Sequence, residues 1–338
     1  GGSDQAESLA YRMLETARKT GDPELTAGAL VDLAQYLNNF KNADLDKAKA
    51  LLEESLEIAR RIDSKRIQAG ALAGLANIYA DIGDIERSYQ YNLEAAELRV
   101  SLGLMDKAAI TYTNLASNLD HMGRVEEAVE YYNKALEIQA QIGNIRALGY
   151  IYNGLAIAHA MDKNLDRAEE SFIKALASHR RIGNRTEEGA VLGNLGTLYK
   201  AKGQPKLSLE YRQQALQICR ETNNRRSEAI LLENIGNTAR EMGDLDKAEE
   251  PLRKALELCT ELGLQSHLAT TLSMLGLLAL DRRQKKEAAA KYTEALPIIA
   301  DTGMAAKVFP EFSKLRERLL DQGAAPKELP LPKAWSEG

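Results

Sequence analysis

The sequence is poor in the residues on which several protein classes depend. Of its 338 residues only two are cysteines, eight are prolines and one is tryptophan, and aromatic residues make up 5%. Two cysteines are too few for a disulfide framework, and so few aromatics disfavour a β-sandwich or barrel. No run approaches the roughly 18 apolar residues of a membrane-spanning helix. A net charge of −5 disfavours a dedicated nucleic-acid binder, which would usually be basic.

What the sequence does contain is typical of a folded helical protein. Hydrophobic residues make up 44% and charged residues 28%, with alanine and leucine frequent. Residues 1–3, Gly-Gly-Ser, resemble a remnant of cloning and lack the charged and apolar regions of a signal peptide. Together with the scarcity of cysteine, this predicts an excised or tagged segment from the cytoplasm.

The chain repeats itself every 40 residues, and internal repeats of this length indicate a stacked architecture. One alanine position recurs at Ala128, Ala168, Ala248 and Ala288, and a second at Ala95, Ala135, Ala175, Ala215, Ala255 and Ala295. A turn glycine recurs at Gly83, Gly123, Gly203 and Gly243, with Lys163 and Arg283 in its place elsewhere. Each period therefore predicts a helical hairpin, which cannot bury its apolar face unless it stacks on its neighbours.

This organisation predicts one all-α solenoid over residues 4–321. A lone helix is expected over residues 4–19, seven hairpins over 25–303 and a closing helix over 304–321, with Pro310 as its main irregularity. Residues 322–338 are expected to be an extended tail, since they hold three of the prolines. Leu329, Leu331 and Trp335 are apolar enough to dock on the last hairpin, on a groove or on a neighbouring molecule, and the sequence leaves this open.

Several segments resemble the tetratricopeptide repeat. They are Tyr112-Thr-Asn-Leu-Ala, Tyr131-Tyr-Asn-Lys-Ala-Leu and Leu192-Gly-Asn-Leu-Gly-Thr-Leu-Tyr. The usual period is 34 residues with a terminal proline, whereas this chain has a longer period and Gly-Asn. It is thus similar to the long repeats of kinesin light chain, of Leu-Gly-Asn adaptors and of bacterial regulators such as the maltose-regulon activator. The resemblance, over about residues 25–303, implies a right-handed α-solenoid with the first helix of each hairpin lining a concave groove.

The helical wheel selects the groove residues. In one first helix, Leu72, Leu75 and Tyr79 form an apolar core stripe with helical spacing. Positions two residues beyond this core stripe are about 200° away from it, on the opposite face. With their neighbours, they are Asn77, Asn114, Ser117, Asn153, Asn194, Thr197, Lys200, Glu233, Asn234, Asn237 and Arg240. A side-chain amide offers two donors and one acceptor in a plane, which match the backbone of an extended peptide. Two interpretations stay open: these amides capture a peptide, or they only tie first helices to neighbouring backbone.

Other chemistries find little support in the sequence. The histidines share no i, i+4 pairing, no Cys/His cluster has metal spacing, and no phosphate loop or nucleophile motif occurs. We therefore expect no enzyme, no cofactor and no metal. The two-carboxylate clamp of the family is expected to be absent, since Ala73, Thr113 and Gly193 occupy its lysine positions. Cys219 and Cys259 are expected to be buried free thiols.

Two functions follow. The preferred one is a non-enzymatic scaffold that binds a peptide or a segment of a partner protein in the groove, without membrane or nucleic acid. The alternative is a ligand-sensing regulatory arm excised from a larger signalling protein, such as an ATPase-type regulator, cyclase or protease.

Overall fold

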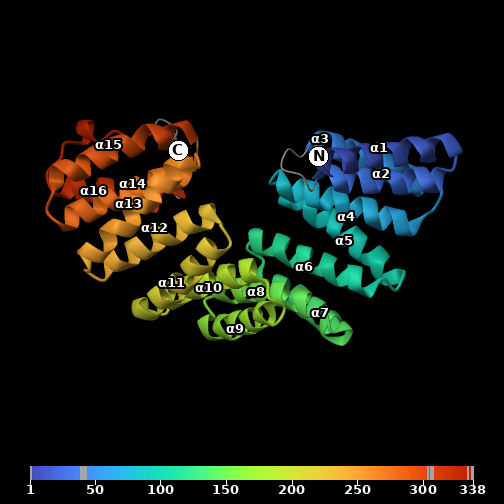
Figure 1. The fold of residues 1–338 in the computed structure, drawn as a ribbon, viewed down its shortest axis with the longest axis horizontal. Helices are drawn as coiled ribbons and strands as arrows, with labels where there is room; N and C mark the ends of the chain where they lie inside the picture. The colour runs from blue at the N-terminus through green and yellow to red at the C-terminus, as the bar shows by residue number, and fades with distance from the viewer. Residues whose placement is uncertain (1, 39–43, 303, 305–307, 333–334, 336–338) are drawn as a thin grey trace. The chain divides into compact units, whose positions relative to one another are not determined.

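The computed structural model describes residues 2–38, 44–302, 304, 308–332 and 335 (Figure 1). Within these ranges the chain forms sixteen α-helices and no β-strand, which confirms the prediction of an all-α solenoid. After α1 (Gly2–Thr20) come seven helix pairs: α2 (Pro23–Asn38) with α3 (Leu45–Arg61), α4 (Lys65–Asp81) with α5 (Ile85–Ser101), α6 (Met105–His121) with α7 (Val125–Ile142), α8 (Ile145–Met161) with α9 (Leu165–Arg181), α10 (Arg185–Ala201) with α11 (Pro205–Glu221), α12 (Arg225–Glu241) with α13 (Leu245–Glu261), and α14 (Gln265–Asp281) with α15 (Lys285–Thr302). The last helix is α16 (Pro310–Asp321).

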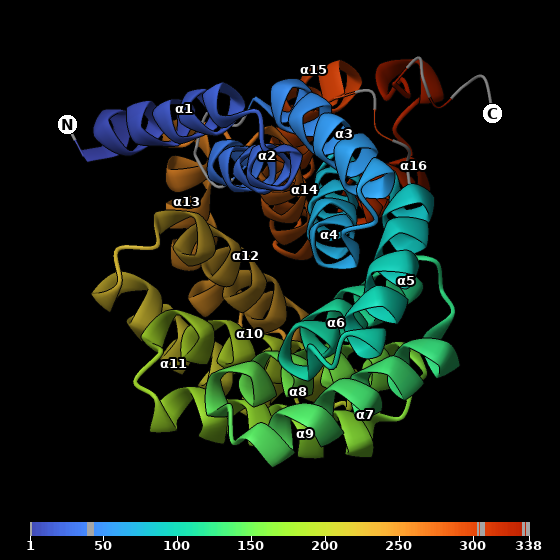
Figure 2. The same ribbon diagram turned by 90° about the vertical axis from the view of Figure 1, so that its right-hand side faces the viewer.

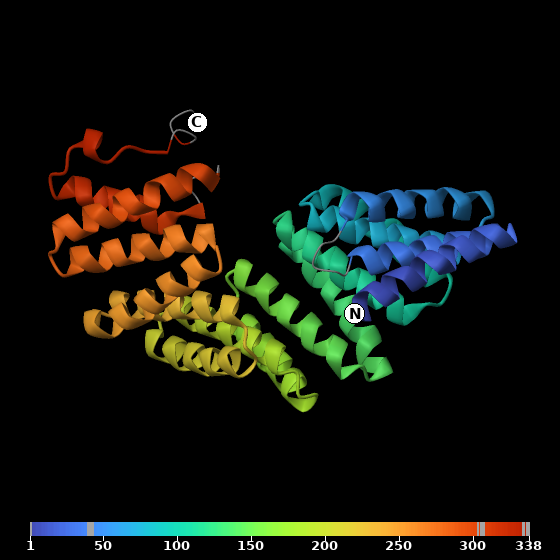
Figure 3. The ribbon, with the colours of Figure 1, turned by 45° about the horizontal axis from the view of Figure 1, so that its top comes forward.

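The chain divides into two compact units, residues 1–178 and 179–338. The division falls within α9. In the first unit α4 packs on α5 and α6 packs on α7 (Figure 2). In the second unit α12 packs on α13, α14 packs on α15, and α16 packs on α14 (Figure 3). No helix of the described ranges is both long and apolar enough to cross a bilayer.

Local sequence sets the helix ends. Helix starts are capped by side chains that accept a hydrogen bond from the backbone N–H three residues later, among them Asp44, Asp84, Asn144, Asn184, Asn224 and Asp244. The turn glycines have positive φ, which glycine adopts without strain. Lys163 and Arg283, which replace glycine in two turns, adopt φ of 59° and 64°. The repeat geometry therefore persists where its preferred residue is missing.

Alanines on the second helices lie where these helices pack closely on a neighbouring helix. All six residues of the second alanine position, from Ala95 to Ala295, are fully buried. Since a methyl group lets helices approach closely, a small residue at this position permits close packing of the second helix. Cys219 and Cys259 lie on the same side of α11 and α13 as free, buried thiols, as the sequence predicted. Burial raises the pKa of the Cys259 thiol to about 11.

The closing helix differs from its prediction. It begins at Pro310, whereas the sequence predicted a start at residue 304, and residues 305–307 lie outside the described ranges. Pro310 is the first helical residue, where its missing N–H costs nothing because that group has no helical partner. The proline is therefore the start of the helix and not an irregularity inside it.

The described part of the tail packs on the last hairpin. Leu329 is buried, and its carbonyl accepts a hydrogen bond from Arg316 Nε at 2.8 Å. The hydroxyl of Tyr292 donates to the Pro330 carbonyl, and Trp335 Nε1 donates to the Met304 carbonyl at 2.8 Å. Trp335 also packs edge-on against Phe312. The tail therefore covers the apolar end of the second unit.

Asp120 gives the first unit a pH-dependent stability. Its Oδ2 accepts a hydrogen bond from the Tyr132 hydroxyl at 3.0 Å, whereas its Oδ1 is buried without a partner in the described structure. Burial raises the pKa of this carboxyl from 3.8 to about 6, against the opposing effects of Tyr132 and His121. Because the folded-state pKa lies above the unfolded one, stability is lost as the pH rises from about 4 to about 6.

We therefore expect Asp120→Asn to stabilise the protein above pH 6. The full shift corresponds to about 3 kcal/mol, and partial solvent screening should reduce the gain to about 1–2 kcal/mol. Denaturant unfolding of wild type and variant at pH 7.5 and pH 4 measures it, and the difference should vanish at the lower pH. Asp81→Asn controls for removal of an exposed carboxylate. A variant less stable than wild type at pH 7.5 would contradict this assignment.

Candidate functional site

A hollow of about 290 Å³ lies in the second unit between the first helices α10 and α12, with α11 as its floor. Three of the residues selected by the helical wheel line it: Asn194 and Thr197 from α10, and Asn234 from α12. Thr197 is exposed, and the two asparagines are half-buried. The structure thus brings these three side chains together at one solvent-open site.

Small residues of α10 keep this hollow open. Gly189, Ala190 and Gly193 form much of its wall. A Cβ atom at Gly193 would approach only Leu231, at 3.6 Å, which is an ordinary van der Waals distance. Packing therefore does not require glycine at this position, and a side chain there would protrude toward the hollow.

The polar groups of the hollow leave bonding capacity for a ligand. Asn234 Nδ2 donates to the Ile230 carbonyl at 2.9 Å, and the Asn234 backbone carbonyl accepts from Arg212 Nη1 at 3.1 Å. The second amide N–H and the Oδ1 of Asn234 have no partner within the described ranges. The Thr197 hydroxyl donates to the Gly193 carbonyl at 3.3 Å and can still accept a hydrogen bond.

Three other predicted groove residues are buried between helices. Glu233 accepts a hydrogen bond from the Thr271 hydroxyl of α14 at 3.0 Å, and Asn237 accepts from Arg240 Nη2 at 3.0 Å. Glu233, Asn237 and Arg240 are 5%, 5% and 6% exposed. Placing them on an open groove was wrong, because α14 covers a second face of α12 that the wheel treats as free.

The charges beside the hollow are paired. Lys200 Nζ lies 2.8 Å from Glu241 Oε2, and Arg240 Nη1 lies 2.9 Å from Asp281 Oδ2. Arg318 of α16 also contacts Asp281, at 2.8 Å. Lys200 is therefore half-buried and held by a carboxylate.

The first unit holds the remaining predicted residues. Asn77 and Ser117 are exposed, and Asn114 and Asn153 are half-buried. Asn114 Nδ2 donates to Asn77 Oδ1 at 3.4 Å, and both line a hollow of about 260 Å³. Here the two side-chain amides bond to each other between α4 and α6.

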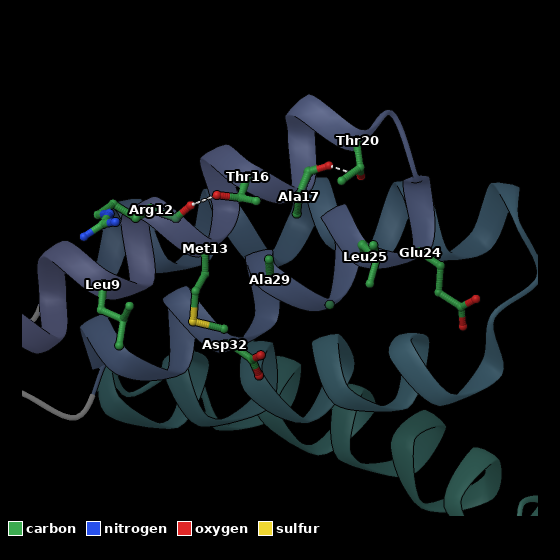
Figure 4. A pocket seen from close by; sticks show the side chains of 11 residues that line it. Leu9, Arg12, Met13, Thr16, Ala17, Thr20, Glu24, Leu25, Ala29 and Asp32 are labelled. Atoms are coloured by element: carbon green, nitrogen blue, oxygen red, sulfur yellow. Dashed lines mark hydrogen bonds between the residues drawn. The ribbon is translucent and has the colours of Figure 1, made fainter.

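Sequence reasoning missed an apolar groove of about 520 Å³ between α1 and α2 (Figure 4). Leu9, Met13 and Leu25, which line it, are 56%, 50% and 54% exposed. One repeat later, the position of Met13 is occupied by Ser55, which is fully buried and donates to the Ala27 carbonyl of α2 at 2.8 Å. The groove therefore lies where the next hairpin has its first helix. Comparing each residue of α1 with its equivalent one repeat later would have indicated it.

A family model for the tetratricopeptide repeat matches residues 67–141, 147–221 and 227–300, more than half of the chain. The chain belongs to the tetratricopeptide repeat family. The resemblance found from the sequence motifs is thereby confirmed. Among curated proteins, none matches this chain in sequence.

Solved structures similar to this tetratricopeptide repeat chain include three from different contexts. BtubC (BKLC) from P. vanneervenii is 25% identical, with a TM-score of 0.58 over 65% of this chain and 92% of that one. A signal transduction ATPase with numerous domains from Pyrococcus horikoshii, which has a tetratricopeptide repeat sensor, is 19% identical with a TM-score of 0.66. The match covers 95% of this chain but only 50% of the ATPase. A Rap protein complexed with competence and sporulation factor is 12% identical, with a TM-score of 0.56 over 95% and 97% of the two chains.

Proposed function

We propose that this chain is a non-enzymatic interaction module that binds an extended peptide, or an extended segment of a partner protein, between α10 and α12. The observation that carries the proposal is the convergence of Asn194, Thr197 and Asn234 on one solvent-open hollow. Asn234 has a free amide N–H and a free amide oxygen there, which together match a peptide unit of an extended ligand.

The size of the hollow favours a peptide over a bulky small-molecule ligand. Its 290 Å³ lie at the lower end of ligand pockets, which suits one or two side chains of a segment that continues along the surface. Main-chain hydrogen bonds would then hold the segment, and the hollow would select the side chain that enters it.

A regulatory sensor arm is the second proposal. The likeness to an ATPase with a tetratricopeptide repeat sensor supports it, because this chain aligns over 95% of its length with half of that protein. Both proposals use the same binding face. A full-length gene that joins these repeats to an effector domain would favour the arm, and a gene that encodes only repeats would contradict it.

The binding face is tested by Thr197→Arg. Thr197 is exposed at the hollow, so a long cation there should block a bound segment and weaken a partner by about tenfold or more. The partner comes from a pull-down with mass spectrometry, and its affinity for both proteins is measured by titration.

Thr293→Arg is the matched control. Thr293 is also exposed and also donates to the carbonyl four residues earlier, at 3.0 Å, but it lies on the second helix α15. The control should bind as the wild type does. Equal affinity of Thr197→Arg and wild type would overturn the assignment of this face.

A further inference from the structure

We infer that the hollow between α10 and α12 binds a carboxylate of its peptide ligand, and that Arg212 at the floor of the hollow is the residue that receives it. The inference rests on the proposed peptide-binding function and specifies the chemistry of the ligand.

Arg212 is a cation at a position that the other repeats fill mainly with apolar side chains. The equivalent residues, 40 residues apart, are Leu52, Asn92, Tyr132, Phe172, Leu252 and Tyr292. Arg212 is only 2% exposed. A buried charge without a counter-ion is costly, so a structural role alone does not account for arginine where leucine serves in two other repeats.

The guanidinium has neutral partners only. Arg212 Nη1 donates to the Asn234 carbonyl at 3.1 Å and to the Thr238 hydroxyl. The remaining N–H groups, on Nε and Nη2, have no acceptor in the described part of the chain, and no described carboxylate lies within ion-pair distance. Burial lowers the pKa of Arg212, and Glu241, which opposes this from a distance, is itself paired with Lys200 at 2.8 Å.

The side chain of Arg212 borders the same hollow as the predicted amides. Arg212, Asn194 and Asn234 all line it. Two guanidinium N–H groups can bind both oxygens of one carboxylate, and such charge-assisted bonds strengthen where water is largely excluded. A carboxylate at this site would supply the missing counter-ion, while the amides hold the adjoining main chain.

This site differs from the two-carboxylate clamp of the family. The lysine position of the clamp in this hairpin is Gly193, on the first helix, whereas Arg212 lies on the second helix at the floor. The carboxylate can come from an Asp or Glu side chain or from a peptide C-terminus, and both present the same group to Arg212.

Arg212→Leu separates binding from folding. In two other repeats this position is a leucine that packs against a glycine. A Cβ atom added to Gly74 would lie 2.8 Å from Leu52, and one added to Gly236 would lie 2.6 Å from Leu252. Gly196 faces Arg212 in the same way, since a Cβ atom added to Gly196 would lie 2.5 Å from the Arg212 Cγ. Leucine therefore fits this site, and the variant should melt at or above the temperature of the wild type.

The experiment follows the Nε–H signal of Arg212 by nuclear magnetic resonance, assigned by its loss in Arg212→Leu. Three tripeptides are titrated at constant ionic strength: acetyl-Ala-Glu-Ala-amide, acetyl-Ala-Ala-Ala with a free carboxylate, and acetyl-Ala-Gln-Ala-amide. We expect a saturable shift with at least one acidic peptide, and at least tenfold weaker binding of the glutamine peptide. The acidic peptide should also bind Arg212→Leu at least tenfold more weakly than it binds the wild type. The side-chain amide signals of Asn194 and Asn234 report this binding. The first two peptides distinguish a side-chain from a C-terminal carboxylate.

Three results would overturn the inference, and they differ in what they leave standing. If all peptides shift the Asn194 and Asn234 amides equally in wild type and Arg212→Leu, the face binds peptides without using Arg212. If no peptide shifts any signal of the hollow, both the carboxylate site and the proposed peptide-binding face are wrong. A variant that melts well below the wild type would show that Arg212 is a structural staple and would likewise count against the inference.

Discussion

Replacing Phe312 by alanine should destabilise the second unit by about 3–5 kcal/mol and release Trp335 from its site, the largest stability effect that we expect. Phe312 is fully buried, and its ring stacks on Tyr292 with centroids 4.4 Å apart. It also contacts Trp335 edge-on at 5.8 Å. A single truncation therefore leaves a cavity in the core of the last hairpin and removes the surface on which the tail packs.

The tryptophan makes this result easy to read, because Trp335 is the only one in the chain. In the wild type its emission should shift to longer wavelength on denaturation, and in Phe312→Ala much of that shift should already be present in native buffer. Leu331→Ala is the control, since Leu331 belongs to the same tail but is 40% exposed. Wild-type emission equal to that of free tryptophan, unchanged by denaturant, would show that the tail does not dock in solution.

The repeats could be predicted because a given structural position requires the same kind of residue in every repeat. Ala95, Ala135 and their equivalents are alanine for one geometric reason, the close approach of neighbouring helices, so the period is visible in the residues themselves. The end of the chain has no such repetition. Pro310 is compatible with a kink or with a helix start, and only the surroundings of residues 308–312 decide between them.

The candidate site was predictable in part, for a similar reason. The wheel selects Asn194, Thr197 and Asn234, which line one hollow, because the facing of each depends on one helix and its own core stripe. It fails for Glu233, whose partner Thr271 lies 38 residues away on the next first helix. The helical wheel of the first helices cannot select Arg212, which lies on a second helix. Its replacement of leucine, tyrosine or phenylalanine in the repeat register is nevertheless visible in the sequence.

The amides of the hollow should carry affinity more than stability, and Asn194→Ala with Asn234→Ala tests this. Each amide–backbone hydrogen bond contributes about 0.5–1.5 kcal/mol net, so the double variant should weaken a partner by roughly 1–3 kcal/mol. That is about 5- to 150-fold in Kd. Melting should fall much less, because both side chains are half-buried and Asn234 loses only its bond to the Ile230 carbonyl.

The matched control is Asn77→Ala with Asn114→Ala in the first unit. Asn114 holds the same repeat position as Asn194 and Asn234, yet its amide bonds to Asn77 at 3.4 Å. If first-helix amides only tie helices together, the two double variants should lower the melting temperature equally, and neither variant should change Kd directly. If the second-unit amides recognise main chain, affinity falls only in Asn194→Ala/Asn234→Ala. Titration of one identified partner against both double variants, together with their melting curves, separates the two roles. Unchanged affinity of Asn194→Ala/Asn234→Ala would show that the binding face does not lie between α10 and α12.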